Sequence, residues 1–385
     1  VIDECLVQGI KPVMNLFHFD MPIELQNKYG GWESKHVVDL FAKFAGQCFR
    51  LFGDRVTDWF TFNEPLVIVD GAYLYQFHYP KIVDGKKAVQ VAYNIALASA
   101  KTIAAFREIN TNPAGKIGII LNLTPSYPAT EEPEDLAAAS FANLWMNDMF
   151  LDAAVKGAFP QELVATFEED GVLWNATTEE LQLIGENTID VLGVNFYHPN
   201  RVQRPSVSAD SLAVDWMPSR YFEEYAMPGR RMNVDKGWEI YPQSLYDIAL
   251  NIRDNYGNIP WFVSENGMGV SREERYLNTE GMIEDDYRIQ FIQEHLYWVA
   301  KGIEEGSNCF GYHLWTPIDC WSWGNAYRNR YGFISNNIHT QVKTIKKSGY
   351  WFKGVSEVGK LEVPDAIVEK WGEPALDFDA AQAVF

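Results

Sequence analysis

The chain has 385 residues, of which 47% are hydrophobic and 14% aromatic, and its formal net charge at pH 7 is −20. This composition suits a large buried core and argues against an intrinsically disordered chain. The negative charge argues against nucleic acids and anionic membranes as partners, because both attract basic surfaces. No hydrophobic run approaches the length of a membrane-spanning helix.

The four cysteines, Cys5, Cys48, Cys309 and Cys320, lack CxxC spacing and are too few for a disulfide framework. Reduced thiols in a cytoplasmic protein are therefore the expectation. The sequence leaves the oligomeric state open, a homo-oligomer included.

The sequence begins within a helical pattern. Residue 1 is Val rather than Met, and residues 1–6 resemble the end of an amphipathic helix that stops near Gly9. A native chain rarely begins with an uncapped helix, so we expect further residues upstream of Val1. The absence of a signal peptide is then uninformative.

Short hydrophobic runs alternate with helical patterns along the chain. We predict strands at residues 12–18, 58–62, 115–121, 188–197, 261–264 and 309–315. Helices are predicted at residues 35–52, 91–106, 133–151, 161–169, 246–255 and 285–302, and from residue 346 onward. No linker or repeat interrupts this alternation, so we predict a single domain over residues 1–385.

Residues 200–241 have no clean periodicity and contain several prolines and the aromatics Trp216, Tyr221, Phe222 and Tyr225. A long loop in a compact domain is usually functional or disordered. The aromatics favour a loop that covers a site.

Polar residues stand at the C-terminal end of almost every predicted strand. They are His18, Asn63 with Glu64, Asn195 with Tyr197, Glu265 and Trp315. Alternating strands and helices imply a parallel sheet. An open doubly wound sheet concentrates its site at one switch point, whereas contributions from all strands are typical of a (β/α)8 barrel. We therefore predict an α/β protein with a TIM-barrel fold. Because six strands do not close that barrel, we expect two βα units upstream.

Glu64 and Glu265 are the two carboxylates that end hydrophobic strands. Either one, taken alone, is compatible with a surface charge or a buried ion pair. As a pair they match glycoside hydrolysis, in which one carboxylate acts as acid and base and the other as nucleophile. No cofactor is needed for that chemistry. A metal site at His18 and Asp20 is disfavoured, because no His-x-x-x-His spacing supports it.

Neighbouring residues supply suitable partners for the two carboxylates. Asn63 can donate to the sugar 2-hydroxyl, and Tyr197 can hydrogen-bond the nucleophile. His18 and Asn195 can donate to other hydroxyls, and Trp315 can stack beneath the ring. For His18, Asn195 and Trp315, a role in packing or structural hydrogen bonding explains the residue equally well.

These motifs resemble glycoside hydrolase family 1 over essentially the whole chain. The resemblance rests on residues 17–22, 61–65, 195–197, 264–267 and 315–319. It implies a (β/α)8 barrel, retention of anomeric configuration, Glu64 as acid/base and Glu265 as nucleophile. The residues on substrate-contacting or nucleophile-supporting positions are His18, Asn63, Asn195, Tyr197 and Trp315.

One departure bears on the substrate. Family members that act on plain glucosides usually carry Glu-Trp where this chain has Ser322-Trp323. Loss of that negative charge favours a phosphate on the sugar O6. The pattern resembles the bacterial 6-phospho-β-glucosidase branch, in which Ser, Lys and Tyr hold the phosphate. Ser322 and Tyr331 fit, whereas Asn329 stands at the lysine position and leaves Arg328 as the candidate cation. The alternative is that this loop is a solvated basic turn.

The expected activity is thus retaining hydrolysis of 6-phospho-β-glucosides, with a small phosphorylated glucoside as partner. Trp323 is also typical of 6-phospho-β-galactosidases, so that activity and ordinary β-glucosidase activity are alternatives. A non-catalytic, sugar-binding fragment is the alternative from another class. The family's first two strands supply a Gln and an Arg to the site, so we expect little activity from the 385 residues alone.

Overall fold

The structure is a computed structural model that describes residues 1–206, 216–359, 361 and 363–371. The chain divides into two compact units. Unit 1 comprises Val1–Gly193 and Asn200–Ala226, and unit 2 comprises Val194–Pro199 and Met227–Phe385. Each unit is described by itself, and a single domain over residues 1–385 stays a prediction.

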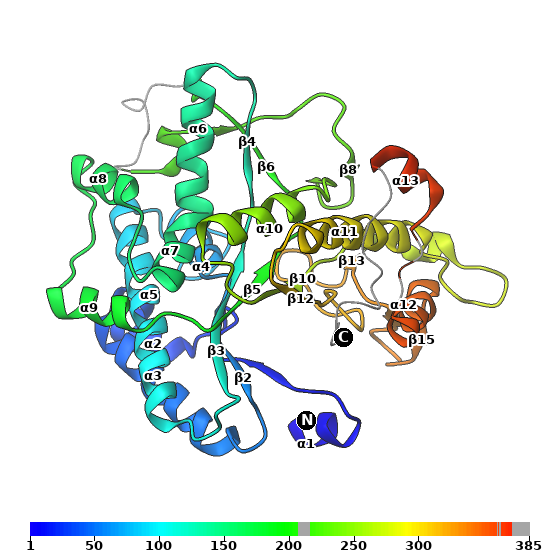
Figure 1. The fold of residues 1–385 in the computed structure, drawn as a ribbon, viewed down its shortest axis with the longest axis horizontal. Coiled ribbons are helices and arrows are strands. Elements are labelled where there is room, and N and C mark those ends of the chain that lie inside the picture. The colour runs from blue at the N-terminus through cyan, green and yellow to red at the C-terminus, as the bar shows by residue number, and fades with distance from the viewer. Residues whose placement is uncertain (207–215, 360, 362, 372–385) are drawn as a thin grey trace. The chain divides into compact units, whose positions relative to one another are not determined.

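The main sheet has six strands (Figure 1). Their order is β1 (Val13–Asn15), β2 (Asp58–Asn63), β3 (Lys116–Asn122), β5 (Val191–Asn195), β10 (Trp261–Glu265) and β12 (Cys309–Tyr312). The β1–β2, β2–β3 and β10–β12 pairs are parallel. Because the strands follow one another in chain order without a reversal, the topology is that of a β/α barrel rather than a doubly wound sheet. The predicted fold class is confirmed.

Unit 1 is built around the buried strands β2 and β3. Helix α3 (Lys35–Phe52) packs against α5 (Gly85–Ile109). Buried side chains of α3 recur every three or four residues, as expected of a helix with one apolar face. The remaining helices are α1 (Ile2–Val7), α2 (Ile23–Tyr29), α4 (Pro65–Tyr73), α6 (Pro133–Asn143), α7 (Met149–Val155), α8 (Gln161–Glu169) and α9 (Thr178–Glu186). A small sheet contains β4 (Ser126–Pro128), β6 (Asn200–Gln203) and β7 (Glu223–Glu224).

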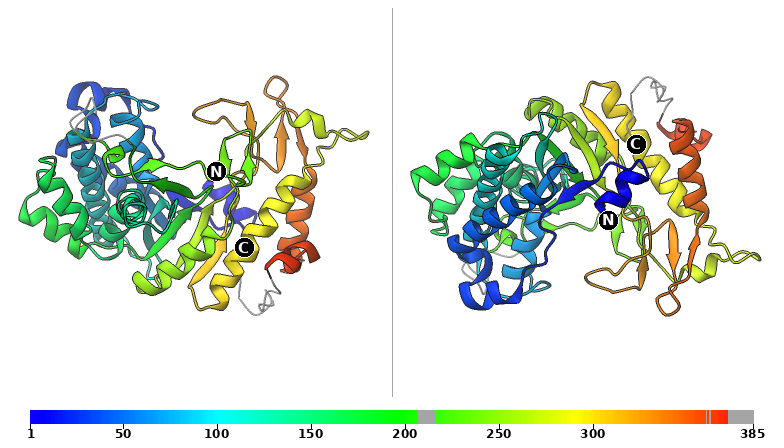
Figure 2. Two further views of the ribbon diagram at one scale, coloured as in Figure 1. Left: turned by 90° about the horizontal axis from the view of Figure 1, so that it is seen from above. Right: turned by 90° about the horizontal axis from the view of Figure 1, so that it is seen from below.

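Unit 2 surrounds β10 and β12. Its long helices are α10 (Ser244–Asn255), α11 (Asp286–Glu304) and α12 (Lys347–Val358), followed by α13 (Asp365–Trp371). Helices α11 and α12, yellow and orange in Figure 2, lie side by side. Three two-stranded sheets pair β8 (Met232–Asn233) with β9 (Trp238–Glu239), β11 (Val270–Ser271) with β13 (Asn329–Arg330), and β14 (Ile334–Asn336) with β15 (Lys343–Ile345).

The predicted elements occur in the structure in the predicted order, with several differences. The helix predicted at residues 133–151 is divided by a π-helical turn, Leu144–Asp148. Helices α2, α4 and α9 were not predicted, since short hydrophobic runs do not distinguish helix from strand. Residues 200–241, predicted as a loop, contain four short strands.

Of the aromatics of that segment, Trp216 belongs to the core of unit 1, and Tyr221, Phe222 and Tyr225 are half-buried. Trp216 is fully buried and packs against Trp145 and Phe167. Tyr221 stacks on Phe141, with ring centroids 3.9 Å apart. The interpretation of these aromatics as a cover for a site is therefore wrong for Trp216 and stays a prediction for the others. Residues 207–215 of the predicted loop lie outside the described residues.

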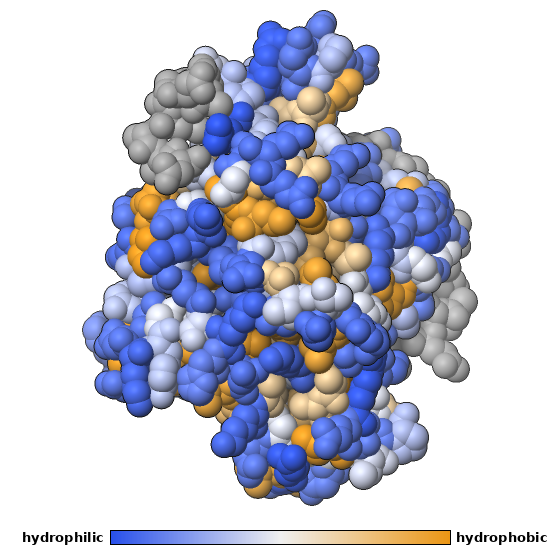
Figure 3. All heavy atoms as spheres, turned by 90° about the vertical axis from the view of Figure 1, so that its left-hand side faces the viewer, coloured by the Kyte–Doolittle hydropathy of each residue, from blue (hydrophilic) through white to orange (hydrophobic). Residues whose placement is uncertain are grey.

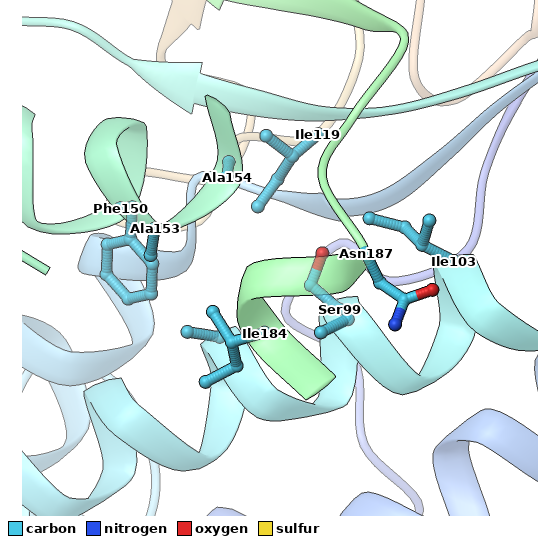
Figure 4. Close-up of a pocket in the computed structure, with 10 residues that line it drawn as sticks. Ser99, Ile103, Ile119, Phe150, Ala153, Ala154, Ile184 and Asn187 are labelled. Carbon is cyan, nitrogen blue, oxygen red and sulfur yellow. The ribbon is translucent and has the colours of Figure 1, made fainter. Parts of the chain in front are cut away.

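A cavity of unit 1 lies between α5, α7, α9 and β3 (Figure 4). Ser99, Ile103, Ile119 and Ile184 line it, and its volume is about 10 Å³. That volume has room for about one water molecule and none for a sugar.

Figure 3 shows one face of the molecule, on which hydrophilic side chains surround small hydrophobic patches. No helix among the described residues is long and apolar enough to cross a membrane.

Candidate active site

Glu64 stands at the turn between β2 and α4. Its backbone is left-handed (φ 47°, ψ 59°), its N–H donates to the Ile120 carbonyl at 2.9 Å, and Pro65 begins the helix. A left-handed backbone costs about 1–3 kcal/mol for a residue with a side chain and persists only where the surroundings fix it. Such strain concentrates at functional sites. The half-buried Glu64 side chain is thus held at the C-terminal end of a buried strand.

His18 and Asn63 lie together beside this turn. Asn63 is 1% exposed, and its Nδ2 is 3.3 Å from His18 Nε2. Burial lowers the pKa of His18, against the opposing charge of Asp20, so the ring is neutral at pH 7. Because Asn63 Nδ2 is a donor, His18 Nε2 accepts and the proton stays on Nδ1. This places a defined N–H donor, as recognition of a sugar hydroxyl requires.

The Glu265 carboxylate ends β10 in unit 2. Tyr197 Oη donates to Glu265 Oε2 at 2.7 Å, and the Phe196 N–H donates to the Glu265 carbonyl at 2.9 Å. The hydrogen bond from the phenol stabilises the ionised carboxylate and fixes its orientation. The structure thus contains the Tyr197–Glu265 hydrogen bond that the sequence suggested.

Residues on both sides of Glu265 are locked by buried hydrogen bonds. Ser264 Oγ donates to Asn195 Oδ1 at 2.7 Å. Asn266 is fully buried, donates to the Phe196 carbonyl at 2.7 Å and accepts from Tyr312 Oη at 2.5 Å. Asn266 and Tyr312 were missed at the level of sequence, although the Asn-Gly pair after Glu265 marks the turn.

Trp315 contacts this turn through its backbone. Its N–H donates to the Asn266 carbonyl at 2.8 Å. A Cβ atom on Gly267 would lie 2.2 Å from the Trp315 carbonyl oxygen, so only glycine fits at residue 267. The turn after Glu265 is therefore packed directly on the segment that precedes the loop at residues 319–331.

That loop carries the residues proposed for phosphate recognition. Ser322 is half-buried, Arg328 is exposed and Tyr331 is 4% exposed. Trp323 is 42% exposed and packs edge-on against Trp321 at 5.2 Å. Asn329 is fully buried, and its Nδ2 donates to the Asp235 carbonyl at 3.3 Å. The Asn329 amide is thus used in holding the loop, and this position offers no charge.

Cys320 lies in this loop and interacts electrostatically with Glu265. Burial, then Asp319, raise the pKa of the Cys320 thiol, and Glu265 adds to the rise. Burial and then Cys320 likewise raise the pKa of Tyr331. The Cys320 thiol therefore interacts electrostatically with both the Glu265 carboxylate and the Tyr331 hydroxyl. A Cβ on Gly269 would lie 2.4 Å from the Tyr331 ring, so the segment after Glu265 supports that ring directly.

A buried charged network lies behind this cluster. Arg288 is fully buried, and its Nη1 donates to the carbonyls of Met268 at 2.6 Å and Tyr331 at 3.0 Å. The carboxylates of Glu273 at 2.5 Å and Asp285 at 2.9 Å neutralise it. Arg288 thus joins the segment after Glu265 to the segment that ends in Tyr331. Nothing in the sequence indicated this role.

Lys346 extends the network to the start of the loop. Its Nζ lies 2.5 Å from Glu273 and 3.0 Å from Asp319, and Asp319 also accepts from the Gly332 N–H at 2.8 Å. Burial, followed by the charge of Arg288, lowers the pKa of Lys346. Both ends of the loop are therefore fixed by one set of charges.

Glu64 lies in unit 1 and Glu265 in unit 2. Within unit 1 the structure brings His18, Asn63 and Glu64 together. Within unit 2 it brings Asn195, Tyr197, Glu265 and Trp315 together with the loop that carries Ser322 and Tyr331. Among the described residues, no group of three His, Cys, Asp or Glu side chains is arranged to hold a metal ion.

The family model for "Glycosyl hydrolase family 1" matches residues 1–360. The chain is 54% identical to the 6-phospho-beta-glucosidase GmuD of Bacillus subtilis, over 93% of this chain and 76% of that protein. It is 33% identical to a 6-phospho-beta-galactosidase of Clostridium acetobutylicum, over 94% of this chain and 78% of that protein. A solved family 1 β-glucosidase from Thermotoga maritima superimposes with a TM-score of 0.83 at 30% identity, covering 94% of this chain and 76% of that structure.

Proposed function

The chain belongs to glycosyl hydrolase family 1, and on that premise we propose that it hydrolyses 6-phospho-β-D-glucosides with retention of configuration. In this proposal Glu265 is the nucleophile and Glu64 the acid/base. The carboxyl groups of retaining enzymes are about 5 Å apart, and we expect that separation here. The observation that carries the phosphate specificity is Ser322, in a loop anchored to the nucleophile cluster, where a carboxylate would repel an anion.

The first chemical step forms a bond between Glu265 and the anomeric carbon while Glu64 protonates the departing oxygen. Tyr197 donates to Glu265 Oε2 and so orients the carboxylate that attacks. In the second step Glu64 removes a proton from water, the water attacks the anomeric carbon, and the bond to Glu265 breaks. His18 and Asn63 would donate to sugar hydroxyls beside Glu64, Asn195 to hydroxyls on the nucleophile side, and Trp315 would stack beneath the ring.

The phosphate on O6 would be held by the loop at residues 319–331. Ser322 and Tyr331 each supply a hydroxyl, Arg328 a charge, and Trp323 a wall of the subsite. Asn329 would act by shaping the loop. The 6-phospho-beta-glucosidase GmuD, at 54% identity, supports this specificity. A phosphorylated sugar and four free cysteines also fit a cytoplasmic protein.

The test compares kcat/KM on p-nitrophenyl β-glucoside and on its 6-phosphate. We expect a strong preference for the phosphorylated substrate, which Ser322→Glu reverses. Ser356→Glu, which adds the same charge at an exposed position of α12, is the matched control and should keep the preference. A wild-type preference for the unphosphorylated glucoside would overturn the phosphate specificity. Absence of turnover on either substrate would favour the non-catalytic alternative.

Hydrolysis of 6-phospho-β-galactosides is the second candidate. Trp323 follows Ser322, as in galactoside-specific members, and a 6-phospho-beta-galactosidase is 33% identical. The epimers differ at O4, so the same assay with the galactoside 6-phosphate decides between them. Exchange of Trp323 for a smaller residue should shift activity toward the glucoside if the ring favours the axial hydroxyl.

A further inference from the structure

Lys236 occupies the turn between β8 and β9. It is half-buried, and its Nζ lies 4.3 Å from the centroid of the Trp238 ring. No carboxylate of the described residues forms an ion pair with it. The neighbouring carboxylate of Asp235 is already engaged, because it accepts from the Ser271 N–H at 3.1 Å and hydroxyl at 2.5 Å. The chain contains 52 acidic and 32 basic residues, so a half-buried lysine without a carboxylate is an exception here.

A second cation, Arg328, acts on Lys236. Asn329 Nδ2 donates to the Asp235 carbonyl at 3.3 Å. This bond brings Lys236, the residue after Asp235, near Arg328, the residue before Asn329. Burial, and then the charge of Arg328, lower the pKa of Lys236. Arg328 also has no carboxylate partner among the described residues. Two facing cations repel each other, and an anion between them would remove that cost.

The pair belongs to the nucleophile cluster. The Trp238 ring, over which Lys236 lies, is 5.4 Å from the ring of Tyr197. Tyr197 in turn donates to Glu265. On the other side, Arg328 is part of the loop that contains Ser322 and Tyr331. An anion held by both cations would therefore lie beside the sugar that Glu265 attacks.

We propose that Lys236 and Arg328 jointly bind the 6-phosphate of the substrate, and that Lys236 replaces the lysine absent at Asn329. This inference rests on the proposed function. The phosphate is a dianion near neutral pH, so two cations match its charge where a single arginine does not. The turn of the β8–β9 hairpin thus becomes a determinant of specificity, supplied by a segment far in sequence from the phosphate loop.

The test measures the ratio of kcat/KM on p-nitrophenyl β-glucoside 6-phosphate to kcat/KM on the unphosphorylated glucoside. Lys236→Met keeps the apolar stem over Trp238 and removes the charge. We expect the ratio to fall by about tenfold to a hundredfold, mainly through KM, as for loss of one hydrogen bond to a charged group. Lys236→Arg should restore most of it. Lys353→Met, a charge loss at a 70% exposed position, should leave the ratio within about twofold.

The outcomes separate this inference from the proposed function. If the wild-type enzyme has no preference for the phosphorylated substrate, the proposed function itself fails. If the wild type has that preference and Lys236→Met retains it, the role of Lys236 is refuted while the function stands. Equal losses on both substrates would also refute it, because they indicate a structural role or contact with the leaving group.

Discussion

The clusters around Glu64 and Glu265, for which we propose catalytic roles, are held in different ways. The backbone of Glu64 is left-handed between Asn63 and Pro65, and its N–H donates to the Ile120 carbonyl of β3. Glu265 is fixed by side chains that are far away in sequence. Its contact with Tyr197 spans 68 positions, and the Asn266–Tyr312 contact that supports it spans 46. A strained backbone turn is therefore the feature of the Glu64 cluster, and side-chain hydrogen bonds between distant segments are the feature of the Glu265 cluster.

The two clusters should therefore be sensitive to different substitutions. A change far from Glu64 leaves its turn intact, provided that β2 and α4 still form. The Glu265 cluster depends on the buried charges of Arg288, Glu273 and Lys346, because these hold the segments on either side of the site. Substitutions of these buried charged residues should lower both the free energy of unfolding and kcat/KM.

The largest effect should come from the carboxylates themselves. Glu265→Gly should reduce kcat/KM at least about ten-thousandfold, because the covalent intermediate is lost. Azide should then restore turnover and give the α-glycosyl azide, since it attacks from the face that Glu265 occupied. Glu64→Gly with azide should give the β-glycosyl azide. Identical stereochemistry from the two variants, read by NMR, would contradict the assigned roles.

Arg288→Met should have the next largest effect. It leaves Asp285 as a buried charge without its ionic partner and Glu273 paired with Lys346 alone, so the free energy of unfolding should fall by about 3–5 kcal/mol. Arg253→Met, which removes an arginine paired with Asp254 and Glu305 near the surface, should cost at most about 1 kcal/mol. Urea unfolding of both variants measures this contrast. Equal losses would show that the Glu265 cluster does not depend on the buried network.

The same contrast decides how much the sequence could predict. Glu64 and Glu265 could be found because each ends a hydrophobic strand and is followed by Pro or Asn-Gly. The Tyr197 contact was within reach, because both residues stand at the ends of strands. Arg288 and Lys236 could not be found, because an arginine on an amphipathic helix and a lysine in a turn are usually exposed. Their roles arise only when separate segments pack together.

A pH experiment tests the helix that follows Glu64. Burial raises the pKa of Asp70 in α4 to about 7, although Trp145 partly offsets this, and its Oδ1 has no hydrogen-bond partner among the described residues. The unfolded carboxyl loses its proton near pH 4 and the folded one near pH 7. Stability contributed by the bound proton is therefore present below pH 4 and lost as the pH rises to 7.

Asp70→Asn stays neutral, so it should unfold less readily than the wild type at pH 8, by up to about 4 kcal/mol, and nearly equally at pH 4. Denaturant unfolding at both pH values measures the difference. Asp254→Asn should change the dependence of the free energy of unfolding on pH in the opposite sense to Asp70→Asn, because Arg253 lowers the pKa of Asp254. Equal pH slopes for the wild type and Asp70→Asn would show that Asp70 is ionised in the fold.

The smallest effect should come from Tyr197→Phe, which removes one donor to Glu265 and little volume. We expect kcat/KM to fall about tenfold to a hundredfold, as for loss of a hydrogen bond to a charged group, and its acid limb to move to higher pH. Tyr246→Phe removes a similar tyrosine–glutamate bond, to Glu305 at 2.6 Å, away from the site and should alter neither. An unchanged pH profile in Tyr197→Phe would mean that the phenol only orients the carboxylate. Glu265 would then owe its ionised state to other neighbours, and the tertiary control argued above would be geometric rather than electrostatic.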